Sequence, residues 1–102
     1  MHLIEILLPL QDEGGSAFPA ENYERLAHEL TERFGGVTSF SRSPAEGRWS
    51  KNGATEHDDI VVLEVMADQI DRAWWSALRK RLMREFKQDD IVIRSHLTEL
   101  LS

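Results

Sequence analysis

The chain has 102 residues, of which 41% are apolar and 29% charged, and this predicts one globular domain over residues 1–102 with a single core. Eighteen acidic residues against 12 basic ones give a formal net charge of -6, which opposes broad attraction to nucleic-acid phosphates. The absence of cysteine excludes disulfides, thiolate metal sites and cysteine nucleophiles.

The first ten residues have the features of neither a signal peptide nor a membrane span. Glu5 and Pro9 interrupt their apolar run, and no basic residues precede it. We therefore expect a cytoplasmic protein that contacts no membrane, which also suits a chain without cysteine.

A strand and a helix are predicted before residue 36. The apolar residues from His2 to Leu8 are too few for an independent helix and end at a proline, which is typical of a buried strand. A helix is predicted from Ala20 to Phe34, because apolar residues recur there at three- and four-residue spacing. Gly35 and Gly36 then supply the left-handed conformation that ends many helices.

A β-prone stretch from Val37 to Arg42 predicts the second strand, which stops before Pro44. Residues 44–57 contain three helix and strand breakers and are mostly polar, so we expect a long connection there. Trp49 lies in its middle without an apolar stripe to join. We interpret Trp49 as a cover over the sheet or as an interface anchor.

The last three elements follow residue 58. Asp59 to Met66 is the most apolar strand, with a single charge inside it at Glu64. A second helix is predicted to begin near Asp68 or Asp71, because apolar residues then recur every four positions, at Ile70, Trp74, Leu78, Leu82 and Phe86. In this pattern Trp74 is central to the buried stripe, and Trp75 flanks it or contacts a partner. Ile91 to His96 forms the final strand.

The predicted order is β-α-β-β-α-β, which is the ferredoxin-like arrangement of the α+β class. It places two helices on one face of a four-stranded antiparallel sheet. The first and third strands in chain order are then the central ones.

Side-chain alternation along the strands puts charged residues on the face that the helices leave open. These residues are Glu5, Glu64, Arg94 and His96. The second strand allows two facings. If Val37 belongs to the core, Arg42 joins the open face and a row of alternating charge runs Arg94, Glu5, Glu64, Arg42; if Phe40 belongs to the core, Arg42 turns inward.

Two interpretations of this face stay open. As a structural feature it is a ladder of cross-strand ion pairs, each contributing roughly 0.2–1 kcal/mol. As a functional one, Glu5 and Glu64 are candidate catalytic acid and base, while Arg42, Arg94, His96 and Trp49 are candidate ligand-binding residues. A sheet face that mixes apolar and paired charged residues usually meets another surface, so we expect a homodimer that binds a small molecule or a protein there.

Other features indicate no metal, cofactor or nucleic-acid site. His57, Asp58 and Asp59 are adjacent in a strand-entry segment and cannot readily converge on one ion. The two glycine pairs lack the spacing of phosphate-binding loops. The basic residues of the second helix are interpreted as a solvated face that complements the helix dipole.

Three stretches of the chain resemble small bacterial proteins of unknown function, namely Phe34–Arg42, Pro44–Trp49 and Asp58–Met66. That resemblance implies no activity and no site residues. The element order is also similar to that of the dimeric α+β barrel group, in which two ferredoxin-like sheets pack face to face. Some members of that group are cofactor-independent oxygenases, isomerases or decarboxylases, so a cofactor-independent enzyme is the alternative that this likeness implies.

Overall fold

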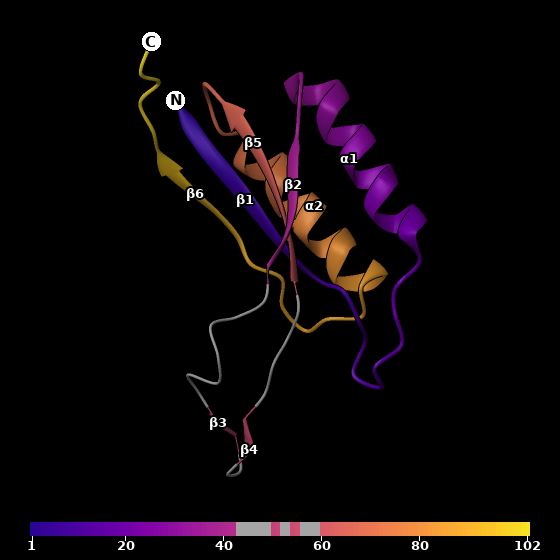
Figure 1. The fold of residues 1–102 in the computed structure, drawn as a ribbon. Coiled ribbons are helices and arrows are strands. Elements are labelled where there is room, and N and C mark those ends of the chain that lie inside the picture. The colour runs from indigo at the N-terminus through magenta and orange to yellow at the C-terminus, as the bar shows by residue number, and fades with distance from the viewer. Residues whose placement is uncertain (43–49, 52–53, 56–59) are drawn as a thin grey trace.

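The protein is described from a computed structural model that covers residues 1–42, 50–51, 54–55 and 60–102. Strands β1 (His2–Pro9), β2 (Thr38–Arg42), β5 (Ile60–Ala67) and β6 (Ile93–Leu97) form one antiparallel sheet. Helices α1 (Ala20–Phe34) and α2 (Arg72–Glu85) both lie on one side of it (Figure 1). The predicted ferredoxin-like α+β fold is confirmed.

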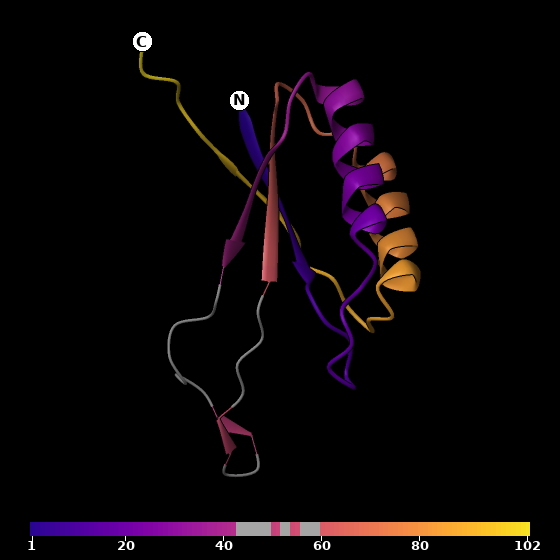
Figure 2. The same ribbon diagram turned by 45° about the vertical axis from the view of Figure 1, so that its right-hand side comes forward.

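The strand order in the sheet is β2-β5-β1-β6, so β1 and β5 are central, as expected. The sheet seen nearly edge-on has both helices on its right and no described element on its left (Figure 2). We call the uncovered side the open face.

The core lies between the sheet and the helices. Ile4, Ile6 and Leu8 of β1 point toward the helices, as do Val61, Leu63 and Val65 of β5, and all six are at most 8% exposed. Alternation along each strand therefore sends the intervening residues to the open face.

Helix α1 has the predicted bounds. Leu26 and Leu30 supply its buried stripe, and Gly35 ends it in the left-handed region at a φ of 84°. The Gly35 N–H donates to the Thr31 carbonyl, which closes the last turn. The sequence predicted both ends of α1 correctly, because the apolar stripe stops at Phe34 and the helix-terminating glycine follows directly.

Helix α2 begins at the Asp71 cap, whose carboxylate accepts a hydrogen bond from the Trp74 N–H at 3.1 Å. The expectation that Trp74 is the central tryptophan was wrong, because Trp75 is the buried one at 8% exposed. Eleven residues make about three helical turns, so Trp75 rather than Trp74 lies above Phe86. Trp74 is half-buried, with the Arg33 guanidinium 4.3 Å from its ring centre.

A long hairpin connection was expected between β2 and β5. Two short strands, β3 (Ser50–Lys51) and β4 (Ala54–Thr55), pair antiparallel within it. Residues 43–49, 52–53 and 56–59 lie outside the described part of the chain, and with them Trp49 and the His57-Asp58-Asp59 segment.

Candidate functional site

Three charged residues of the open face, Glu64, Glu5 and Arg94, form one row across the sheet, which we call the charged row. Glu5 of β1 pairs directly with Glu64 of β5 on one side and with Arg94 of β6 on the other. Directly paired residues of antiparallel strands have Cβ atoms about 4.5–5.5 Å apart. The register therefore brings two carboxylates and one guanidinium together, as the sequence indicated.

Glu5 is unusually deep for a carboxylate on this face. Its side chain is 12% exposed, and its Oε1 accepts a hydrogen bond from the Nε of Arg94 at 3.0 Å. The Arg94 side chain is 50% exposed, so the pair joins a buried anion to a partly solvated cation. A charge at this depth needs such a partner, because an unpaired carboxylate would lose its hydration without compensation.

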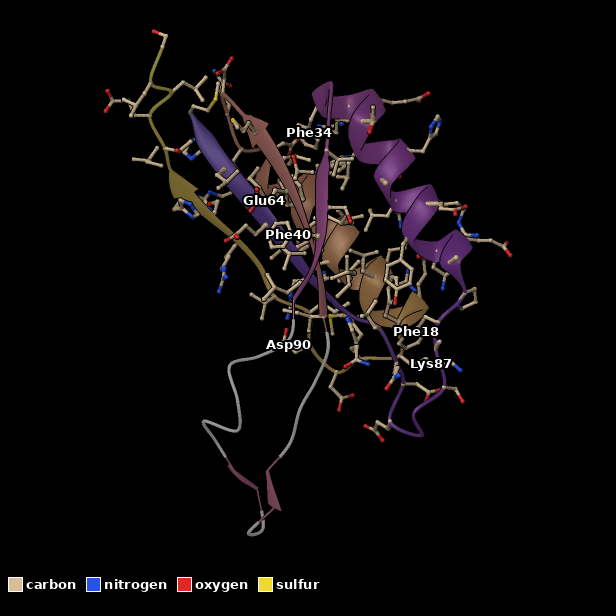
Figure 3. The ribbon with its side chains drawn as sticks, viewed as in Figure 1. Phe18, Phe34, Phe40, Glu64, Lys87 and Asp90 are labelled. Carbon is tan, nitrogen blue, oxygen red and sulfur yellow. The ribbon has the colours of Figure 1, made fainter. Side chains whose placement is uncertain are left out.

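An apolar row lies beside the charged one. Val62 is fully buried although it points to the open face, because Phe40 and Leu7 are its direct partners on the two neighbouring strands. Phe40 is 38% exposed and lies near Glu64 (Figure 3). The open face thus combines a carboxylate pair, an arginine and an apolar surface within two rows of the sheet.

The remaining ligand-binding candidates are placed differently. His96 pairs with Leu3 and is exposed one row from Arg94. Arg42 pairs with Ile60, four residues along β5 from Glu64, which is about 13 Å at the rise of a strand. Position 42 is therefore on the open face but not in the charged row; the side chain of Arg42 and all of Trp49 lie outside what the structure describes.

The prediction that Arg42 lies next to Glu64 in the charged row was wrong, because Thr38 is the residue paired with Glu64. The facing of β2 followed from alternation, but its register depends on where β2 starts against β5. β2 begins at Thr38, three residues after the Gly35 cap, and this start puts Thr38 opposite Glu64. No local signal in the sequence distinguishes that register from one shifted by a full pleat.

The described surface also has two pockets, one next to the edge strand β6 and one between the helices. One of about 150 Å³ opens between β6 and the start of α2, where Ile70, Trp75 and Ile93 line it together with Arg72, Arg94 and Ser95. No sequence pattern indicates this pocket, because its lining residues come from separate elements of the chain.

The second pocket, of about 540 Å³, lies between α1 and α2 and is lined mainly by charged residues. Glu29 accepts hydrogen bonds from both terminal nitrogens of Arg81, and these bonds raise the pKa of that guanidinium above its usual value. Because this ion pair links α1 to α2, we interpret it as a structural contact between the helices.

The described residues provide no metal centre. Within residues 1–42 and 60–102, no three histidine, aspartate or glutamate side chains lie together as a metal ion would require. In the same part of the chain, neither helix is long and apolar enough to cross a membrane.

Comparison with known proteins adds a likeness of fold. No protein-family model matches the chain, and no curated protein is similar to it. Among solved structures, it is similar to a phage SAM lyase in complex with S-methyl-5'-thioadenosine. The TM-score is 0.60 at 13% sequence identity, and the match covers 93% of this chain and 79% of the lyase chain.

Proposed function

We propose that this chain is a cytoplasmic, homodimeric module that binds a small ligand at the open face of its sheet. The observation that carries the proposal is Glu5, a carboxylate only 12% exposed on the side of the sheet that no described element covers. An apolar residue at this position would fit the same packing without needing a charged partner. A buried, hydrogen-bonded charge beside an accessible surface is a feature typical of binding sites.

The neighbours of Glu5 indicate the chemistry of the ligand. Carboxylates at Glu5 and Glu64 accept hydrogen bonds, while Arg94 donates them. The adjoining surface at Phe40, Val62 and Leu7 is apolar and suits a ring or an aliphatic group. The proposed ligand is therefore a small molecule with hydrogen-bond donors at one end and an apolar body.

The other candidate residues belong to the rim of this site. His96 lies one row away, on the side of Arg94. Arg42 is two rows away on the opposite side, and Trp49 follows it in the chain. We retain these three as ligand contacts in the proposal, with Arg42 as an anion-binding group and Trp49 as a cover.

The alternative is a cofactor-independent enzyme. The observation that favours it is the direct pairing of Glu5 with Glu64, since two neighbouring carboxylates can divide the roles of acid and base. Glu5 is engaged by Arg94, which leaves Glu64 as the proposed base and Arg94 as the group that stabilises a developing negative charge. A lyase with the same fold is compatible with this alternative.

Native mass spectrometry of freshly purified protein tests the binding proposal. We expect an additional small-molecule mass on the wild type, loss of that mass in Glu5→Gln and Glu64→Gln, and its retention in the surface control Glu13→Gln. A thermal-shift titration with S-methyl-5'-thioadenosine provides a defined first probe of the same site. Retention of the mass in all three variants would contradict a site at the charged row.

The enzyme alternative has a separate test. Once a bound molecule is identified, turnover by the wild type that is lost in Glu64→Gln, while binding is retained, would support catalysis. If the wild type binds the molecule without turning it over, the enzyme alternative is contradicted and the binding proposal remains.

A further inference from the structure

The outer edge of β6 carries unpaired backbone groups. β6 is the last strand of the order β2-β5-β1-β6, so among the strands that the structure describes only β1 pairs with it. The Val92 carbonyl accepts from the Leu7 N–H and the Thr98 N–H donates to the Met1 carbonyl, so the even-numbered residues face β1. Ile93, Ser95 and Leu97 therefore direct their N–H and C=O groups outward, where a further strand can pair with them.

The 150 Å³ pocket opens along this same edge. Its apolar wall is formed by Ile70, Trp75 and Ile93, and its polar wall by Arg72, Arg94 and Ser95. A strand added to β6 would place alternate side chains over this pocket. Those side chains should be apolar beside Ile93 and acidic beside Arg72.

The chain itself contains a segment of that character. Leu97, Leu100 and Leu101 are 76%, 61% and 89% exposed, and Glu99 lies between them. The segment continues from β6 beyond the end of the sheet and away from the helices (Figure 2). Such a run of exposed leucines is costly in water unless another surface covers it.

We propose that the segment Leu97–Leu101 of a second copy adds to β6 as an antiparallel strand, reciprocally, about a twofold axis at Leu97. In this register the partner's Glu99 lies opposite Ser95, on the side of the sheet where Arg72 lies. The partner's Leu101 lies opposite Ile93, where it covers the apolar wall of the pocket. One symmetric contact then pairs the outward backbone groups, covers the leucines and brings Glu99 of each copy to Arg72 of the other.

This inference rests on the proposed function only for the homodimer, and it specifies how that homodimer is built. The two sheets lie side by side rather than face to face, so the open face stays accessible to ligand. On that face the partner's Leu100 falls opposite Arg94, which adds an apolar side chain next to the Glu5–Arg94 pair. Each binding site is then completed by the other copy.

Single cysteines test the register, because the natural chain has none. Leu97→Cys places two thiols across the twofold axis, with Cα atoms about 5.5 Å apart, within the range of a disulfide. We expect a disulfide-linked dimer of Leu97→Cys after mild oxidation. The matched control is Phe40→Cys, which would link the copies only if the open faces met. Cross-linking of Phe40→Cys without that of Leu97→Cys would overturn the side-by-side arrangement.

Charge exchange tests the pocket contact without disturbing the core, because Glu99, Leu101 and Arg72 are all exposed. By sedimentation equilibrium, Glu99→Arg and Leu101→Ser are each expected to raise the dimer dissociation constant about tenfold or more, whereas Glu13→Arg leaves it unchanged. Adding Arg72→Glu to Glu99→Arg should restore much of the affinity.

The outcomes separate the two proposals. A dimer whose dissociation constant is insensitive to Glu99→Arg and Leu101→Ser overturns the β6 contact and leaves the homodimer standing. A wild type that is monomeric at all concentrations overturns both the contact and the homodimer, while the ligand experiment on Glu5 still decides binding by itself.

Discussion

At the scale of single residues, Tyr23 connects α1 to the end of β1. Its hydroxyl donates to the Pro9 carbonyl at 2.6 Å, and its ring lies against Phe86 with 5.1 Å between ring centres. Burial of the hydroxyl raises the pKa of Tyr23, because the phenolate would be less well hydrated than in the unfolded chain.

The raised pKa of Tyr23 predicts a loss of stability at high pH. The folded protein holds the phenol proton more tightly than the unfolded chain does, so the full contribution is present below the unfolded pKa of about 10 and is lost as pH rises through the folded value. Because Tyr23 is the only tyrosine, ultraviolet absorbance reports its ionisation alone. We expect titration at higher pH in the native protein than in urea.

Tyr23→Phe is the control for this prediction. The variant should lose less stability than the wild type between pH 9 and pH 11, since it has no phenol to ionise. Identical titration of Tyr23 in native and denaturing conditions would contradict the assigned burial.

Glu5 shows where residue-scale reasoning from sequence ends. Alternation along β1 placed it on the open face, and its pairing with Arg94 followed from the strand order. Its burial did not follow, because the shielding comes from neighbouring strands and depends on register. The sequence thus predicted that Glu5, Glu64 and Arg94 share a row, but not that Arg42 lies outside it.

At the scale of elements, the end of α1 depends on one glycine. Gly35 has a φ of 84°, whereas the next residue, Gly36, is outside the positive-φ region. A side chain in the left-handed conformation costs about 1–2 kcal/mol. The end of the helix therefore requires glycine at position 35 and tolerates a side chain at position 36.

Matched alanine variants test this difference. Gly35→Ala should lower the free energy of unfolding by about 1–2 kcal/mol, and Gly36→Ala should change it by less than about 0.5 kcal/mol. An added Cβ at either position meets no atom within 4 Å, so steric contact does not separate the two. If urea unfolding gave both variants the same loss of unfolding free energy, the left-handed conformation of Gly35 could not be the cause.

Helix α2 illustrates a limit of pattern reading within an element. Its capping residue was among the two predicted, since Asp71 is a favourable residue at a helix start. The two tryptophans were assigned in the wrong order, because a spacing of four drifts around a helix of 3.6 residues per turn. Phe34, which stacks on Trp75 from α1, contributes a contact that no pattern in α2 contains.

At the scale of the whole molecule, Phe86 joins the layers of the fold. It is fully buried directly after α2, and Phe18 from the loop before α1 packs against it edge to face, with 5.2 Å between ring centres. Tyr23 meets it from α1. One side chain thus holds together parts of the chain that are distant in sequence.

Truncation of the Phe86 side chain should destabilise the fold strongly. Phe86→Ala is expected to reduce the free energy of unfolding by about 3–5 kcal/mol, because it removes buried area and leaves a cavity. Phe40→Ala on the open face should cost clearly less, since that ring is already 38% exposed. Urea unfolding followed by far-ultraviolet circular dichroism measures both. A larger loss for Phe40→Ala would mean that the open face is covered in solution.

The sequence by itself determined the class of fold, the bounds of α1, the central position of β1 and β5, and the set of charged residues on the open face. These features depend on periodicity and on residues next to each other in the chain, such as the apolar stripe of α1 followed by Gly35. The tertiary structure decided that Thr38 rather than Arg42 completes the charged row, how deeply Glu5 is buried, which tryptophan enters the core, and that a pocket lies beside the edge strand β6. Each of these depends on the register and packing of elements far apart in sequence, and such contacts leave no local pattern.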